Sequence, residues 1–129
     1  PAVPLIFQLG DALKLIEAEG LQNSFARHAR LAAMTRAGAK ALGLTLFAAD
    51  ENRASNAVTS IRRPEGIATA DLRKLMRDKY AIVISGGQGK IKDDIFRIGH
   101  LGFVGEKEVL ATWNKEAAFM NRWIAKKKG

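Results

Sequence analysis

Arg97 lies between two large apolar residues, Phe96 and Ile98, within residues 94–98, which have the pattern of a buried strand. On a strand, Ile95 and Arg97 share one face, so a permanent cation lies beside an apolar neighbour. This arrangement costs free energy unless an anion or hydrogen-bond acceptors meet the cation. Because a guanidinium binds a carboxylate through two parallel hydrogen bonds, we interpret Arg97 as a candidate receptor for a small acid. The alternative is an edge-strand arginine that reaches solvent or pairs with a structural Asp or Glu.

A glycine-rich stretch before this strand has a superficial likeness to a phosphate-binding loop: Gly86, Gly87, Gln88, Gly89 and Lys90. A P-loop needs a first glycine five positions before its Gly-Lys pair, and Ser or Thr after the lysine. Positions 84 and 91 are both isoleucine. We therefore reject a phosphate loop and interpret the stretch as a turn that lets the backbone pass close to another group.

The chain has two histidines, and their spacing matches no metal-ligand pattern, so we expect no metal site. His28 lies in a predicted helix, where a solvated or interface role is expected. His100 stands between two glycines close to Arg97, which makes it a candidate cleft residue. None of the serines has the context of a nucleophile elbow.

The composition limits the classes of function. The chain has 129 residues, a formal net charge of +8 and no cysteine, so disulfides and thiolate chemistry are excluded. Neither a membrane-spanning run nor a signal-peptide pattern is present, and we expect a cytoplasmic protein. The basic residues are spread along the chain, and no aromatic-rich strand accompanies them, so nucleic acid is an unlikely partner.

Hydrophobic periodicity predicts helices over residues 4–19, 22–42 and 69–79 and from about 105 onward. Strands are expected over residues 44–48, 57–61, 80–85 and 95–98, and the almost wholly apolar 80–85 is expected to be central. This order predicts an α+β fold, with a small mixed or antiparallel sheet of about four strands and helices on one face. We expect one domain over 1–129.

Residues 1–112 resemble the C-terminal small domain of class V, fold-type-I pyridoxal-phosphate aminotransferases. The likeness is to the alanine–glyoxylate and serine–pyruvate group, which includes proteins described as a small subunit of soluble hydrogenase. Residues 113–129 depart from the family pattern as a divergent helix and basic tail. The matching elements run in order along the chain: Pro1 to Ile6, Glu19 to Leu21, Arg27-His28, Ala41 to Leu44, Val58-Thr59, Pro64 to Gly66, Ser85 to Gly89 and Phe96 to Gly102.

The resemblance implies roles for residues that the patterns alone leave open. The arginine at the position of Arg97 binds the substrate α-carboxylate in that family. The loop of Gly86, Gly87, Gln88 and Gly89 would lie at a domain interface beside the active site, with His100 nearby. The family's Schiff-base lysine belongs to a large domain, and no lysine here stands in its motif. The resemblance thus implies a small domain that is inactive alone and needs a large cofactor-binding domain and a dimer mate.

Two alternatives remain open at this stage. The chain could be a stand-alone basic α+β module that binds protein or nucleic acid. It could also be an isolated or engineered fold without activity.

Overall fold

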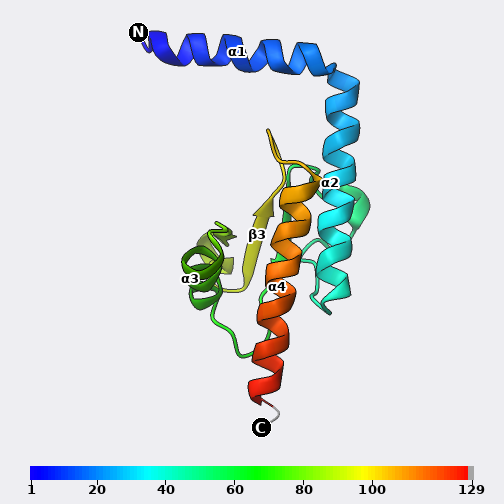
Figure 1. The fold of residues 1–129 in the computed structure, drawn as a ribbon, viewed down its shortest axis with the longest axis vertical. Helices are drawn as coiled ribbons and strands as arrows, with labels where there is room; N and C mark the ends of the chain where they lie inside the picture. Colours follow the sequence, from blue (N-terminus) through cyan, green and yellow to red (C-terminus); the bar gives the residue numbers. More distant parts are fainter. Residues whose placement is uncertain (128–129) are drawn as a thin grey trace.

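The computed structural model describes residues 1–127, and it describes the side chains of all of them except 116, 117 and 119–127. Its helices are α1 (Val3–Glu19), α2 (Leu21–Ala41), α3 (Thr69–Tyr80) and α4 (Glu106–Lys127) (Figure 1). The first three begin and end close to the residues predicted from periodicity, and α4 begins close to its predicted start. The basic tail and most of the predicted divergent segment 113–129 lie outside the residues described in full.

Three strands form an antiparallel sheet in the order β1-β3-β2, with β1 at Val58–Arg62, β2 at Ser85–Gly86 and β3 at Ile95–Gly99. Helices and a small antiparallel sheet confirm the predicted α+β fold. The described sheet has three strands rather than about four, and β3 is its central strand.

The predicted strand at 44–48 is wrong, because it contributes only an isolated bridge between Leu46 and Ile61. Two backbone hydrogen bonds hold it beside β1, from Phe47 to Ser60 and from Arg62 to Thr45. The segment therefore touches the sheet edge without continuing the ladder.

The predicted central strand at 80–85 is also wrong. Tyr80 is the last residue of α3, and Ala81 has a φ of 54°, a left-handed conformation that ends the helix. The Ile82 N–H then bonds to the carbonyl of Met76, which keeps this part of the chain at the helix terminus. Only Ser85 and Gly86 pair with β3, at a sheet edge. A short apolar run does not distinguish a strand from a buried helix end.

The core lies on one face of the sheet, and α2, α3 and α4 cover that face (Figure 1). Ile61, Phe96 and Ile98 project from the strands into one cluster with side chains of all three helices. The helical contributions are Leu31 and Ala39 of α2, Leu72 and Met76 of α3, and Val109 and Trp113 of α4. Strand alternation then leaves Arg97 on the opposite face, away from these helices.

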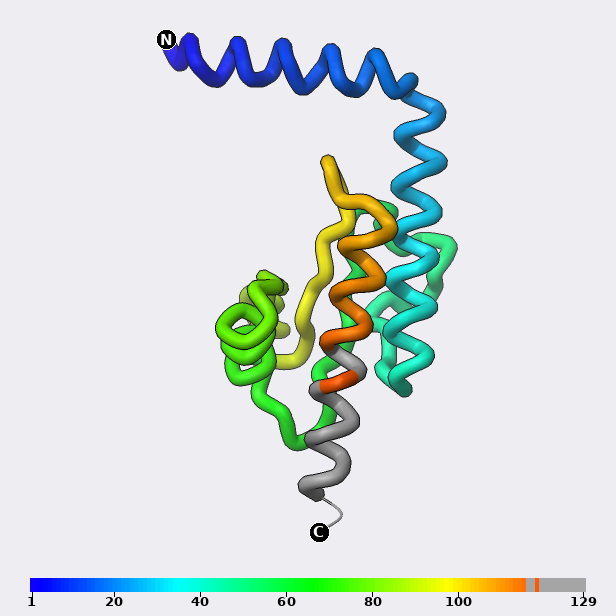
Figure 2. Tube along the Cα trace, viewed as in Figure 1, coloured from blue at the N-terminus to red at the C-terminus, as the bar shows by residue number. Residues whose placement is uncertain are grey.

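Helix α1 extends from the body of the protein as an arm, at a sharp angle to α2 (Figure 2). Gly20 separates the two helices with a φ of 84°, a conformation that favours glycine. No residue of α1 is buried, although the helix carries large apolar side chains such as Leu5, Phe7 and Leu9. Among the described residues, no helix is long and apolar enough to span a membrane.

Candidate functional site

Arg97 lies on central strand β3 with a hydroxyl residue directly opposite it on each neighbouring strand. The register pairs Arg97 with Ser60 of β1 and with Ser85 of β2. Residues directly opposite each other share a face and lie about 5 Å apart at Cβ. On the face away from the helices, Arg97 is therefore flanked by two short hydrogen-bonding side chains. Sequence reasoning did not identify this pair of serines, because strand register depends on tertiary structure.

The guanidinium of Arg97 is partly buried, and its Nε donates a hydrogen bond of 2.8 Å to the carbonyl oxygen of Gly86. Within the part of the chain whose side chains are described, no carboxylate oxygen lies within 4 Å of its nitrogens. The alternative of a structural ion pair with Asp or Glu therefore finds no support in these residues.

The glycine-rich loop lies beside Arg97, so the structure brings these two predicted site elements together. The N–H of Gly87 points toward the carbonyls of Lys92 and Ile95, which folds the loop back on β3. A Cβ at Gly87 would lie 2.0 Å from the carbonyl oxygen of Ile91, so only glycine fits there. Gln88 and Gly89 follow at the start of a short 3-10 turn, with Gly89 at a φ of 54°.

His100 is buried inside this chain rather than exposed beside Arg97, and its place near a domain interface stays a prediction. Its side chain is fully buried, and its Nε2 is 2.9 Å from the hydroxyl of Thr59. Burial lowers the pKa of His100 because the charged imidazolium loses its hydration. Strand alternation explains the placement, since His100 is three residues beyond Arg97 and projects to the helix-covered face.

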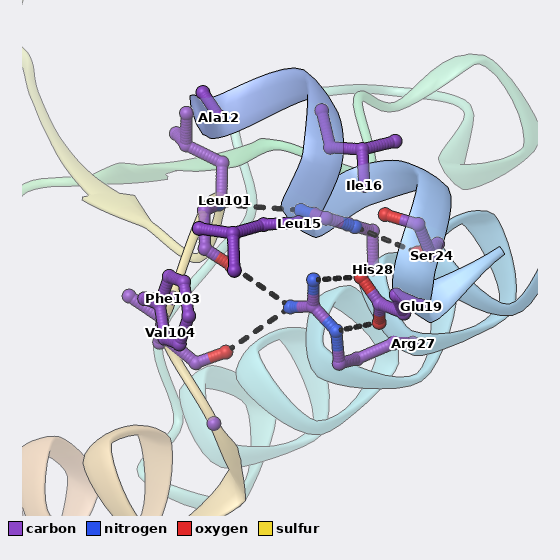
Figure 3. Close-up of a pocket in the computed structure, with 12 residues that line it drawn as sticks. Ala12, Leu15, Ile16, Glu19, Ser24, Arg27, His28, Leu101, Phe103 and Val104 are labelled. Atoms are coloured by element: carbon purple, nitrogen blue, oxygen red, sulfur yellow. Dashed lines mark hydrogen bonds and ion pairs between the residues drawn. The ribbon is translucent and has the colours of Figure 1, made fainter. Parts of the chain in front are cut away.

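A second group of polar contacts centres on Arg27 of α2 (Figure 3). Its Nε and Nη2 each donate to one oxygen of Glu19, at 2.5 and 2.9 Å, across the bend at Gly20. Its Nη1 donates to the carbonyl oxygens of Gly102, at 2.9 Å, and Val104, at 3.4 Å. The hydrogen bond from Arg27 lowers the pKa of Glu19, and the same contact raises the pKa of Arg27.

His28 makes a second contact with the loop that follows β3. Its Nδ1 is 2.7 Å from the carbonyl oxygen of Ser24, so Nδ1 carries the proton and donates. Its Nε2 is then left to accept from the backbone N–H of Gly102, at 3.3 Å. Both backbone groups of Gly102 are thus bound by side chains of α2.

These contacts lie beside a cavity of about 590 Å³ between α1 and the loop that follows β3 (Figure 3). Its lining is mostly apolar, with Leu15 and Ile16 from the helix and Leu101, Phe103 and Val104 from the loop. Arg97 does not line it, and neither does any lysine.

Sequence reasoning missed this arrangement, although it noted the Arg27-His28 pair. One local signal was present: Glu19 and Arg27 are complementary charges on either side of the helix-ending Gly20. The contact with Gly102 joins residues 75 positions apart, and no local pattern predicts it.

Comparisons with known proteins place the fold and sequence among aminotransferases. No family model matches the chain. An uncharacterized aminotransferase of Methanocaldococcus jannaschii is 50% identical over 112 residues, which is 87% of this chain and 29% of that protein. The serine–glyoxylate aminotransferase of Hyphomicrobium methylovorum is 42% identical over 106 residues, 82% of this chain and 26% of that protein.

A solved structure shows the same relationship in three dimensions. The pyridoxamine–pyruvate aminotransferase of Mesorhizobium loti superposes with a TM-score of 0.85 at 36% identity, covering 92% of this chain and 31% of that one. A soluble hydrogenase small subunit of a Synechococcus species is also 49% identical over 111 residues, 86% of this chain and 28% of that protein. The chain therefore spans between a quarter and a third of the length of these relatives. It is homologous to one segment of the class V aminotransferases, with the fold of their small domain.

Proposed function

We propose that this chain is the small domain of a pyridoxal-phosphate-dependent aminotransferase and that Arg97 binds the α-carboxylate of its substrate. The substrate class is a small amino acid such as alanine or serine, with glyoxylate or pyruvate as the acceptor. The observation that carries the proposal is the state of Arg97: it is held at Nε by Gly86 and has no carboxylate partner among the described side chains.

This geometry suits an anion receptor. The hydrogen bond from Nε to a backbone carbonyl fixes the plane of the guanidinium and leaves its two Nη groups to face a ligand. A carboxylate can then accept two parallel hydrogen bonds from those groups. Ser60 and Ser85, on either side, add hydroxyl donors within reach of the same anion. An arginine on a central strand is also more rigidly placed than one on a loop.

The described residues do not by themselves form a site for pyridoxal phosphate. The large cavity contains no lysine and lies away from Arg97. When bound, this cofactor supplies an electron sink for carbanion chemistry, and it needs a lysine anchor. We infer that the anchor belongs to the remainder of the protein and that this chain alone has no transaminase activity. Its own contribution is to bind and orient the substrate.

Helix α1 is the proposed contact surface for that remainder. Its exposed apolar residues include Leu5, Ile6, Phe7 and Leu9, with between 59 and 71% of each side chain exposed. The superposition on the Mesorhizobium loti structure leaves 8% of the chain unmatched, about ten residues, fewer than the 17 of α1. Part of the arm therefore belongs to the structure shared with a longer aminotransferase, whose additional length can cover it. A dimer mate and a cytoplasmic location stay predictions from the family resemblance and the composition.

A hybrid enzyme tests this proposal. In it, this chain replaces the matching 106-residue segment of the Hyphomicrobium methylovorum serine–glyoxylate aminotransferase. We expect the hybrid to transfer the amino group of serine to glyoxylate in the presence of pyridoxal phosphate, and this chain alone to show no turnover. A folded hybrid that binds the cofactor but has no activity would contradict the proposal, and so would activity of the chain alone.

A further inference from the structure

We propose that Arg27 is a positioning residue for Arg97. It links helix α1 to the loop that continues β3. It thereby sets the position of the strand that carries Arg97 relative to the remainder of the enzyme, on which α1 is proposed to dock. The inference rests on the proposed function, because it assigns Arg27 a part in placing the substrate-binding arginine.

Arg27 connects two elements that are far apart in the sequence, the C-terminal end of α1 and the loop after β3. Three of its nitrogens are engaged, two by the carboxylate of Glu19 and one by the carbonyls of Gly102 and Val104. The side chains of Arg27 and Glu19 are only 27% and 30% exposed, so water competes weakly for this bidentate pair. Charge-assisted, two-point hydrogen bonds fix orientation as well as distance. Arg27 therefore holds the C-terminal end of α1 and residues 102–104 in one geometry.

Helix α1 has few other contacts that fix its direction relative to α2. None of its residues is buried, and the chain bends at Gly20, a residue with broad conformational freedom. The Glu19–Arg27 pair spans this bend. Loss of the pair would let α1 change its angle to α2 with little loss of apolar contact.

The loop that Arg27 binds is continuous with the strand that carries Arg97. Gly102 follows β3 by three residues, and both its N–H and its carbonyl are bound by side chains of α2, from His28 and Arg27. Its φ of 73° favours glycine, and the loop continues to α4 at Glu106. A shift of this loop is therefore transmitted to the end of the strand that carries Arg97. The adjoining cavity leaves room for such a shift on the α1 side.

A purely structural role for Arg27 is the competing explanation, and a double-mutant cycle in the hybrid enzyme separates the two. Glyoxylate KM and kcat are measured for the parent, Arg27→Ala, Arg97→Ala and the double variant. We expect Arg27→Ala to raise KM about tenfold with a smaller change in kcat. In the Arg97→Ala background the same change should add less than about twofold, because the group being positioned is gone. Arg27→Lys, which keeps the charge but loses the two-point geometry, should lie between the parent and Arg27→Ala.

Arg30→Ala is the matched control. Arg30 lies one turn further along α2 and makes a more exposed ion pair with Glu106. We expect it to leave KM within about twofold of the parent. The positioning role would be overturned if Arg27→Ala raised KM by the same factor in the parent and in Arg97→Ala. It would also be overturned if Arg30→Ala raised KM as much as Arg27→Ala does. Either result would leave the proposed function intact. If Arg97→Ala itself leaves KM unchanged, the proposed function fails, and the positioning role fails with it.

Amide hydrogen exchange on this chain gives a readout that is independent of activity. Arg27→Ala should speed exchange at Gly102 and in the last turn of α1 by about tenfold, because the Gly102 carbonyl and the Glu19 carboxylate lose the side chain that restrains both segments. Arg30→Ala should leave these amides unchanged. Unaltered exchange in Arg27→Ala would show that Arg27 does not hold the arm to the loop and would overturn the inference.

Discussion

Arg97 donates a hydrogen bond from Nε to the carbonyl oxygen of Gly86, which joins the central strand to the glycine-rich loop at a distance of 2.8 Å. One contact thus orients the guanidinium and attaches it to a loop with a conformation that only glycine at position 87 permits. The proposed carboxylate receptor therefore depends on the packing of that loop as well as on the arginine.

Gly87→Ala should disturb both the fold and the receptor. The added methyl group would lie 2.0 Å from the backbone carbonyl of Ile91, so the loop must move. We expect a loss of about 1–3 kcal/mol in the free energy of unfolding, measured by urea denaturation. In the hybrid enzyme, glyoxylate KM should also rise. Gly89→Ala is the control, because a Cβ there meets nothing within 4 Å and only its φ of 54° is unfavourable. A loss as large in Gly89→Ala would contradict the steric explanation.

The packing of α2 on α4 predicts that alanine at two helical glycines, Gly38 and Gly10, has opposite effects on stability. A Cβ at Gly38 would lie 2.4 Å from Cδ1 of Trp113, whereas a Cβ at Gly10 meets nothing within 4 Å. Gly38→Ala should destabilise the chain by about 1–3 kcal/mol, because overpacking outweighs the gain in helix propensity. Gly10→Ala should increase the helical circular dichroism and leave the unfolding midpoint unchanged or higher. Equal stability of the two variants would show that the contact with Trp113 is not tight.

The buried His100 predicts a pH dependence of stability. Its pKa in the folded state lies below the ordinary value of 6.5, so the unfolded chain binds the extra proton more readily. The stabilisation is complete above pH 6.5 and decreases as the pH falls through the lower folded pKa, with a slope of at most about 1.4 kcal/mol per pH unit. Unfolding free energies measured at several pH values should show this decrease in the parent. In His100→Asn the slope in this pH range should become smaller, and an unchanged slope would assign the effect to another group.

The exposed apolar surface of α1 predicts that a charge placed there affects the hybrid enzyme but not the folding of this chain alone. Leu9→Asp should change the stability of this chain by less than about 0.5 kcal/mol, because Leu9 is 59% exposed. In the hybrid enzyme the same substitution should lower the melting temperature, because the charge would then face an apolar partner surface. Gln8→Asp introduces the same charge at the adjacent exposed position and serves as the control. If Leu9→Asp destabilises this chain by itself, α1 packs on the body of this domain instead.

Helices were predictable here because their signals are local. Gly20 ends α1, and apolar periodicity places both ends of α2 and α3, and the start of α4, within about one residue of their observed positions. The strands were less predictable, since the apolar residues 80–84 form the end of a helix and its exit rather than a strand. Whether such a run pairs depends on the partners available, and a single sequence does not contain that information.

In the candidate site, too, local features were predictable from the sequence and tertiary contacts were not. Alternation along residues 94–98 correctly separated Arg97 from the core-facing Phe96 and Ile98. His100 projects into the core of this chain, because closeness in sequence to Arg97 does not mean the same face of a strand. The contact of Arg27 with Gly102 was beyond local reasoning, since it depends on how α2 packs beside the loop.

The glyoxylate KM of the hybrid enzyme carrying Arg97→Ala, compared with that of Arg62→Ala, tests the central claim most directly. Arg62 lies on the same sheet face, with its guanidinium 5.2 Å from the centre of the Phe47 ring, and so controls for the loss of a cation there. We predict that Arg97→Ala raises KM by about 10- to 100-fold, the value of a lost charge-assisted hydrogen-bond pair, while Arg62→Ala stays within about twofold. Equal KM values for the two variants would contradict the assignment of Arg97 as the carboxylate receptor.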